Sequence, residues 1–400
     1  MSIILFSIFS VLVFFTPLLF GTPTYETYEL PKMFFVYVLG GIILWVFFIG
    51  RFSMGKVKKL VLPSREILAF VLFYGISTAL SVHRYTSVWG YYKRFNGGLV
   101  SVLIFVGLFL VLINEFKREQ IRALINHMAL AGIPVSAYAI YQHYGSDQIV
   151  RAYSTFGQAN WLAAFLVMIA LVALTNLVEA KNRGESWFWS TAFILSFWGM
   201  WVTYSVSGVL GFLVGAIYFL ILHKNVLKQK SRQLLFLFIL ILGISVSSPG
   251  IFDDKIRDIF IDLKKVYAQD ELLENSVSDP GYIRTELWAG TLKLFASSPK
   301  NILFGTGPET FPYAFQEFRP LSLNYSSEWE FVFNKPHNYY LELLSTVGVL
   351  GTGAYLLVMK RAFRSPYSPV LIAFYVTNFF GWPTVATALF FWLILAETET

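Results

Sequence analysis

Long apolar runs without charge dominate this chain and decide what it can fold into. They recur from the first residues to the last, and many reach the ~20 residues that a helix needs to cross the hydrocarbon core of a bilayer. In that core every backbone N–H and C=O must be satisfied within the protein, so spanning segments fold as helices rather than as open sheets. The sequence therefore predicts an all-α, polytopic membrane helix bundle.

The overall composition excludes several classes of protein. Of the 400 residues, 56% are hydrophobic and only 14% are charged, whereas about a quarter of the residues of a globular chain carry charge. A water-soluble enzyme, a disordered chain and a nucleic-acid-binding module are thereby excluded. The net charge of +7 does not reverse this, because most Lys and Arg lie in short clusters between apolar runs. The absence of cysteine excludes a disulfide, a thiolate nucleophile and a Cys-ligated zinc site.

Eleven apolar stretches are candidate membrane spans. They cover residues 2–20, 33–50, 66–82, 98–113, 121–141, 160–178, 187–204, 207–222, 233–249, 338–359 and 370–396. The last stretch is broken by Gly381-Trp382-Pro383, so we interpret it as two short helices joined by a tight turn, with one long kinked helix as the alternative. We expect about 12 spans, with 11 as the alternative. The first run lacks a basic segment before it and is expected to be a retained helix rather than a signal peptide.

The loop charges predict how the bundle is oriented. If the N-terminus is inside and the spans alternate, the inside loops hold 17 Lys and Arg and the short outside loops hold 5. Short loops rich in Lys and Arg remain in the cytoplasm. We therefore expect both termini to face the cytoplasm.

One long loop interrupts the pattern of short connections. Residues 250–336 lie outside by the same alternation, and a loop of this length is usually functional or disordered. Its many Phe, Tyr, Trp and Leu residues favour order. We expect an amphipathic helix over 252–267 and a second helix over 282–296. The chain thus divides into a bundle of about nine spans at 1–249, this loop, and C-terminal transmembrane helices at 337–400.

The loop ends on a polar cluster at the mouth of a span. His337 follows Pro336, Asn338 beside it can hydrogen-bond, and Glu342 lies one turn further along. Polar groups at the membrane face under a long loop indicate a functional site. A single interfacial histidine is more often structural, and residue chemistry alone leaves both interpretations open.

Two arginines are candidates for contacting anions. Arg284 shares a helix face with Trp288, four residues on, and its planar guanidinium matches phosphate oxygens. An interfacial side chain with its charge in water is the alternative. Arg151 precedes the segment 154–160, which ends at Asn160 beside a span, and it can reach an anionic headgroup or be a loop charge without a role.

Other motifs were weighed and set aside. Gly305-Thr306-Gly307 lacks the Lys-Ser or Lys-Thr of a phosphate loop and marks a tight turn. Asp253-Asp254 has no partners that would complete a divalent metal site, so no metal is expected. No internal repeat stands out, which argues against an inverted-repeat transporter.

Three segments resemble the O-antigen ligase and polymerase superfamily of bacterial envelope glycosyltransferases. The first runs from Arg151 to Asn160 into a span, similar to the pattern R…G-T-F-G-N-x-N. The second is Arg284-x-x-x-Trp288, followed by Gly305-x-Gly307 and Phe311. The third is Pro336-His337-Asn338-x-Tyr340-Leu341-Glu342, with Gly348 and Gly351 beyond it. Their order and spacing and the long loop before the His-Asn motif fit this family over about residues 150–355.

The resemblance implies a membrane glycosyltransferase at the outer face of the inner (cytoplasmic) membrane, with 250–336 as its catalytic loop. The donor would be a glycan on a polyprenyl diphosphate lipid, and the acceptor a lipid A-core sugar, another lipid-linked glycan or a protein side chain. Membrane lipids would be partners, and no nucleic acid, nucleotide sugar, metal or other cofactor would be needed. The implied catalytic residues are His337 and Arg284, and the implied substrate contacts are Arg151, Asn160, Trp288, Asn338 and Glu342.

One position departs from the family pattern. Many members carry Ser-Arg where the seventh and eighth spans meet, whereas this chain reads Tyr204-Ser205-Val206-Ser207-Gly208. If Val206 takes the arginine position, one phosphate contact is missing.

A polymerase differs from a ligase only in its acceptor. A transporter or flippase of lipid-linked glycans would need a polar path, which the apolar spans do not show, and a metal-dependent oligosaccharyltransferase would need acidic ligands.

Overall fold

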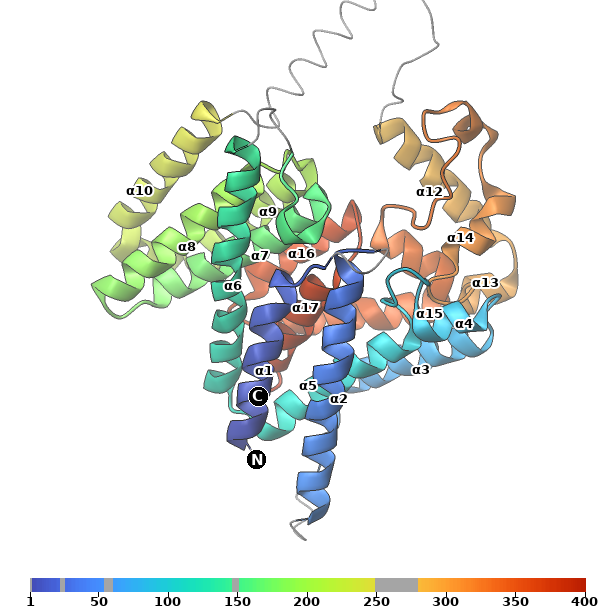
Figure 1. Ribbon diagram of the computed structural model, residues 1–400, viewed down its shortest axis with the longest axis horizontal. Coiled ribbons are helices and arrows are strands. Elements are labelled where there is room, and N and C mark those ends of the chain that lie inside the picture. The colour runs from blue at the N-terminus through green and yellow to red at the C-terminus, as the bar shows by residue number, and fades with distance from the viewer. Residues whose placement is uncertain (1, 22–25, 54–59, 146–150, 249–279) are drawn as a thin grey trace, which may run out of the picture.

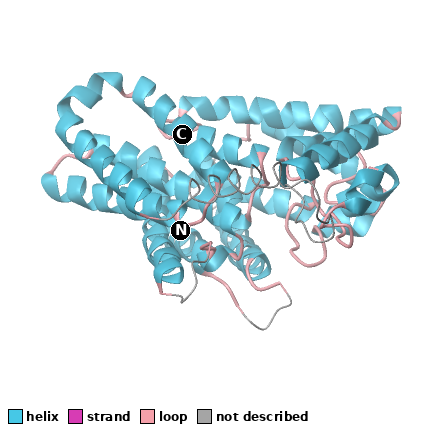
Figure 2. Cartoon of the chain, turned by 90° about the horizontal axis from the view of Figure 1, so that it is seen from above, coloured by secondary structure: helices cyan, strands magenta, loops and turns pink. Residues whose placement is uncertain are grey.

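The computed structural model describes residues 2–21, 26–53, 60–145, 151–248 and 280–400. Over these residues the chain consists of helices joined by loops, and no strand is present (Figures 1 and 2). The predicted all-α class is confirmed for the described chain. The amphipathic helix expected at 252–267 lies outside the described residues.

Every predicted span coincides with a helix. These helices are α1 (Ser2–Phe15), α2 (Glu29–Ser53), α3 (Arg65–Ala79), α5 (Leu99–Glu115), α6 (Arg118–Tyr144), α7 (Ala159–Glu179), α8 (Arg183–Trp201), α9 (Val206–Leu222), α10 (Lys224–Ser247), α15 (Tyr339–Arg361), α16 (Ser368–Phe379) and α17 (Val385–Glu397). The broken stretch 370–396 forms two helices, α16 and α17, as the Gly-Trp-Pro break predicted.

In the described part of the chain, five stretches are long and apolar enough to cross a membrane by themselves: Glu29–Arg51, Arg118–Tyr144, Ala159–Glu179, Lys230–Ser247 and Tyr339–Arg364. Five further apolar segments are shorter, at Ser2–Leu18, Leu99–Glu115, Val206–Leu222, Ser368–Phe379 and Val385–Glu397. These lengths support a membrane-embedded helix bundle. The number of about 12 spans stays a prediction.

The centre of the bundle is α7, whose apolar stretch is 89% buried. It packs against α6, α8, α9 and α16, and a helix that is apolar on all sides belongs in such a position. Small residues allow close approach around it. Gly211 and Gly215 of α9 lie against Ala373 of α16, the kind of contact that favours helix association in lipid.

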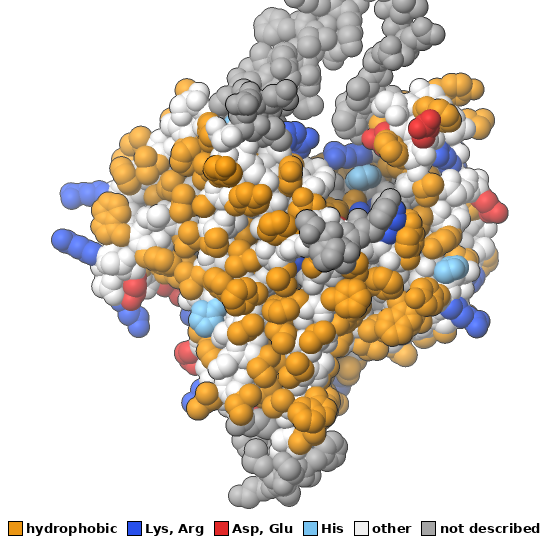
Figure 3. All heavy atoms as spheres, in the orientation of Figure 1, with side chains coloured by type: hydrophobic (Ala, Val, Ile, Leu, Met, Phe, Trp, Pro, Cys, Tyr) orange, Lys and Arg blue, Asp and Glu red, His pale blue; other side chains and the backbone are white. Residues whose placement is uncertain are grey.

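The outer helices present apolar side chains rather than polar ones. On α10, Leu235 and Val246 are 60% and 80% exposed, and Trp45 of α2 is 65% exposed. Hydrophobic side chains cover most of the face shown in Figure 3. Exposed apolar area on this scale is unusual for a soluble monomer and fits contact with lipid.

The described residues before α15, 280–338, fold into a compact helical unit, which we call the loop unit. The predicted helix at 282–296 is present as α12 (Pro280–Ala296), and two short helices that the sequence did not predict follow, α13 (Pro299–Phe304) and α14 (Phe311–Ala314). These helices lie together on one side of the molecule (Figure 1). The unit has an apolar core of its own, made by Ile283, Leu287, Leu294, Phe311, Phe315, Leu323 and Phe333.

A break in α15 docks this unit onto the bundle. Gly348 has φ 75° and ψ −179° inside the helix, which frees the carbonyls of Ser345 and Thr346. They accept hydrogen bonds from the N–H groups of Thr306 and Gly307 at 3.0 and 2.9 Å. The predicted tight turn at 305–307 is therefore one of the contacts between the loop unit and α15.

We predict that Gly348→Ala destabilises the protein by about 1–3 kcal/mol, because this backbone region is essentially restricted to glycine and a Cβ would overlap the Leu303 carbonyl. The control is Gly353→Ala in the same helix, where a Cβ would meet nothing within 4 Å. The apparent Tm of the purified protein measures the difference. An equal Tm for the two variants would contradict this account of the break.

Candidate functional site

His337 is held by contacts on both sides of it in the chain. The Pro336 carbonyl accepts a hydrogen bond from the Trp288 indole N–H at 3.0 Å. Asn338 caps α15, and its Oδ1 accepts from the N–H groups of Tyr340 and Leu341 at 3.0 and 3.1 Å. His337 itself has φ 55°, in the left-handed region. The chain before α15 is thus built to present this imidazole in one orientation.

The imidazole lines a small cavity, which we call the His337 cavity. Its volume is about 20 Å³, and Asn160, Trp161, Ser207, Asn378 and Trp382 are among its other lining residues. The His337 ring lies 5.2 Å from the Trp382 ring between centroids. The structure therefore brings together two of the predicted site residues, His337 and Asn160, from segments that are far apart in the sequence.

Two guanidinium groups act on His337. Burial, followed by the charges of Arg284 and Arg94, lowers the pKa of His337 to about 4. The imidazole is consequently neutral at physiological pH. Trp288, one turn along α12 from Arg284, connects the same helix to the backbone before His337, and a joint role of Arg284 and His337 stays a prediction.

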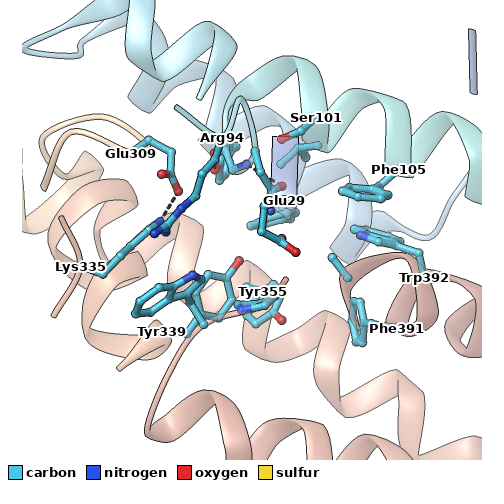
Figure 4. Close-up of a pocket in the computed structure, with 18 of the residues that line it drawn as sticks. Glu29, Arg94, Ser101, Phe105, Glu309, Lys335, Tyr339, Tyr355, Phe391 and Trp392 are labelled. Atoms are coloured by element: carbon cyan, nitrogen blue, oxygen red, sulfur yellow. Dashed lines mark hydrogen bonds and ion pairs between the residues drawn. The ribbon is translucent and has the colours of Figure 1, made fainter. Parts of the chain in front are cut away.

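A buried ion cluster forms around Lys335, two residues before His337 in the chain. Lys335 is paired with both Glu309 and Glu342 (Figure 4 shows the pair with Glu309), and the exposed fractions of these residues are between 3% and 9%. Burial works to lower the pKa of Lys335, but the two carboxylates outweigh it and raise this pKa. Glu342, implied by the resemblance to contact substrate, is therefore engaged in fixing the segment that carries His337.

A larger cavity, the Lys335 cavity, opens beside this cluster. Its volume is about 80 Å³, and its charged lining residues are Glu29, Arg94, Glu309 and Lys335, with aromatic side chains around them (Figure 4). Trp382 lines both cavities. The two cavities are therefore neighbours, and the charged groups of the Lys335 cavity lie close to the His337 cavity.

Some predicted residues lie apart from both cavities. Arg151 is exposed, lines neither cavity and donates from Nε to the Thr203 carbonyl at 3.1 Å. Val206 is the first residue of α9 and is 46% exposed. Ser205 caps that helix by accepting from the Gly208 N–H at 3.2 Å. This stretch supplies a helix start, and its contribution to the His337 cavity is Ser207.

Three residues at the site were not identified from the sequence: Arg94, Glu309 and Trp382. Arg94 appeared only as one charge of a short loop, and Trp382 only as part of a helix break. Neither belongs to a recognisable motif, and the packing of α15, α16 and the loop before α5 is what brings them to His337. Within the described part of the chain, no group of three or more His, Asp or Glu residues could hold a metal ion.

We predict that Lys335→Met lowers the stability by about 3–5 kcal/mol, because it leaves the carboxylates of Glu309 and Glu342 buried without their counter-charge. Lys293→Met on α12 is the matched control, since Lys293 is exposed. Thermal unfolding in detergent measures both variants. If Lys335→Met unfolds at the wild-type temperature, the cluster does not hold this segment.

Comparison with known proteins gives a family match over part of the chain. Residues 191–356 match the family model described as O-antigen ligase, which confirms the resemblance found in the sequence. The matched region runs from α8 to α15 and contains Arg284, the 305–307 turn and His337, whereas Arg94 and Trp382 lie outside it. A search of curated proteins gave no match.

Proposed function

We propose that this membrane protein, whose residues 191–356 match O-antigen ligase, transfers a glycan from a polyprenyl diphosphate lipid to an acceptor hydroxyl. The observation that carries the proposal is that His337 lines a cavity at the start of α15, where burial and the charges of Arg284 and Arg94 lower its pKa. A base or hydrogen-bond acceptor next to cationic groups suits a reaction in which a hydroxyl attacks and an anion departs.

Arg284 is proposed to stabilise the departing diphosphate. The acceptor oxygen forms a bond to the anomeric carbon as the bond from that carbon to the diphosphate oxygen breaks. The diphosphate oxygen keeps the electron pair, and polyprenyl diphosphate leaves as a stabilised anion. Cationic hydrogen-bond donors in a partly dehydrated site are most effective where this charge develops. Direct displacement inverts the configuration of the anomeric carbon.

His337 is proposed to orient the acceptor hydroxyl and take its proton. In the free protein the low pKa makes the imidazole a hydrogen-bond acceptor and a weak base. A bound diphosphate would offset the positive charges of Arg284 and Arg94, so the pKa of His337 would rise when the donor is present. Proton acceptance would then be coupled to donor binding by electrostatics.

The other site residues have supporting roles in this proposal. Asn160 lines the His337 cavity and is placed to hydrogen-bond the substrate. Trp288 and Asn338 position His337 through the backbone bonds described above. Arg151, exposed beside the α8–α9 connection, is assigned an outer contact with the anionic donor.

The acceptor defines the choice between a ligase and a polymerase. A ligase would use a lipid A-core sugar or a protein side chain, and a polymerase another lipid-linked glycan. The same two groups, His337 and Arg284, serve either reaction. The test is incubation of the purified protein in lipid with a polyprenyl-diphosphate glycan and each acceptor in turn.

We expect His337→Ala and Arg284→Ala to lower transfer at least a hundredfold while the protein stays folded in the membrane, with Lys293→Ala on α12 as the control. Because His337 is neutral down to low pH, the acid limb that it gives to kcat/KM should lie near pH 4 rather than near 6.5. Full activity in both variants would contradict the mechanism. An intact donor that crosses vesicle bilayers would instead indicate a transporter.

We also propose an inner-membrane orientation with both termini in the cytoplasm and the segment before α15 outside. The chain has no cysteine, so single cysteines report position without background. Tyr325→Cys, at a residue 91% exposed, should react with a membrane-impermeant maleimide in intact cells, whereas Lys181→Cys, also exposed, should react only after permeabilisation. The reverse pattern would invert the topology.

A further inference from the structure

We propose that Arg94 is a second anion-binding residue of this site and contacts the diphosphate of the donor from the N-terminal part of the bundle. The inference rests on the proposed function and adds a residue that lies outside the matched family region. It is carried by how the Arg94 guanidinium is held and by what surrounds it.

The loop between α4 (Arg84–Trp89) and α5 holds Arg94 in a defined place. Phe95 and Gly97 both have positive φ, at 50° and 78°. The Tyr37 hydroxyl donates to the Phe95 carbonyl at 2.7 Å, and the Tyr74 hydroxyl donates to the Gly97 carbonyl. Two helices, α2 and α3, therefore anchor the backbone directly after Arg94.

The guanidinium lies in the corner made by two indole rings. Its central carbon is 5.0 Å from the ring centroid of Trp161 and 5.6 Å from that of Trp382. The two rings meet edge to face, 5.7 Å apart. Aromatic faces attract a cation without using its N–H donors, and those donors lie in the plane of the guanidinium. The in-plane edge of Arg94 is thus left to bind something else.

Among the described residues no carboxylate forms an ion pair with this cation, although Glu29 feels its charge. The acidic residues that line the Lys335 cavity with Arg94 are Glu29 and Glu309. Glu309 is bonded to Lys335, and Glu29 accepts from the Val385 N–H at 2.8 Å. Among the described residues, neither acid nor any other forms an ion pair or side-chain hydrogen bond with Arg94. Other half-buried arginines have such partners, as Arg361 does with Glu66 and Glu399.

The position fits a diphosphate that spans the site. Arg94 and Arg284 both act on His337 electrostatically, yet one comes from the N-terminal bundle and the other from α12. Trp382 contacts both the Arg94 guanidinium and the His337 ring. Two guanidinium groups on different elements both act on the His337 imidazole. This arrangement suits a ligand that carries two phosphate groups next to the transferred sugar.

The test measures binding of radiolabelled farnesyl diphosphate, a soluble analogue of the polyprenyl product, to the full chain in lipid nanodiscs. We expect Arg94→Ala to weaken binding at least tenfold, as is typical when a charge-assisted hydrogen bond is lost, and to reduce its salt dependence. Farnesol, which lacks the phosphates, should bind as it does to the wild type. Arg84→Ala, at an exposed arginine in the same connection, is the matched control.

Two further variants keep the test decisive if Arg94→Ala does not fold. Arg94→Lys retains the charge and should keep part of the diphosphate affinity, whereas Arg94→Gln fills the space without charge and should lose it. Diphosphate affinity within twofold of the wild type in Arg94→Gln, or equal losses for farnesol and farnesyl diphosphate, would overturn the inference.

The outcomes separate this inference from the proposed function. Arg94-dependent diphosphate binding by a wild-type protein that transfers no glycan would support the anion site and refute the transferase. Glycan transfer with an unchanged donor KM in Arg94→Gln would support the transferase and refute the role of Arg94.

Discussion

The pairing of Lys335 with Glu309 and Glu342 is the interaction on which the rest of the site depends. It joins three parts of the chain, namely the loop unit, the segment before α15 and the first turn of α15 itself. A buried charge is tolerated only when it is paired and hydrogen-bonded. Because one ammonium group pairs with two carboxylates, displacement of any of these parts would leave a charge buried without its partner. That cost keeps His337, two residues after Lys335, in its place.

The second constraint is the satisfaction of backbone groups where α15 is broken. An interrupted helix at membrane depth is tolerated only where other parts of the protein bond the freed carbonyls. Here the 305–307 turn supplies the donors, and Ser77 of α3 adds a hydroxyl to the Thr346 carbonyl at 2.8 Å. The same bonds therefore complete the helix and attach the loop unit. The Trp288 bond to Pro336 then orients that unit relative to His337.

The acidic and basic side chains near His337 differ in how they are paired. The acids near His337 are engaged, Glu309 and Glu342 by Lys335. Burial lowers the pKa of His337 most, and the positive charges of Arg284 and Arg94 lower it further. Aromatic rings hold Arg94 without cancelling its charge. Positive charge that is not cancelled favours an anionic ligand, which fits the proposed polyprenyl diphosphate donor.

The sequence by itself determined the long apolar helices and the break at Gly381-Trp382-Pro383, because hydropathy, Pro and Gly act locally. It named His337 as a candidate from its polar neighbours, and Arg284 and Trp288 through the family resemblance. The tertiary structure alone decided that Glu342 is bonded to Lys335, that Arg151 lies outside the cavities and that Arg94 and His337 both lie against the Trp382 ring. These contacts depend on how distant helices pack, because residues 94, 161, 337 and 382 come together only in the folded bundle. No local sequence pattern predicts that they do.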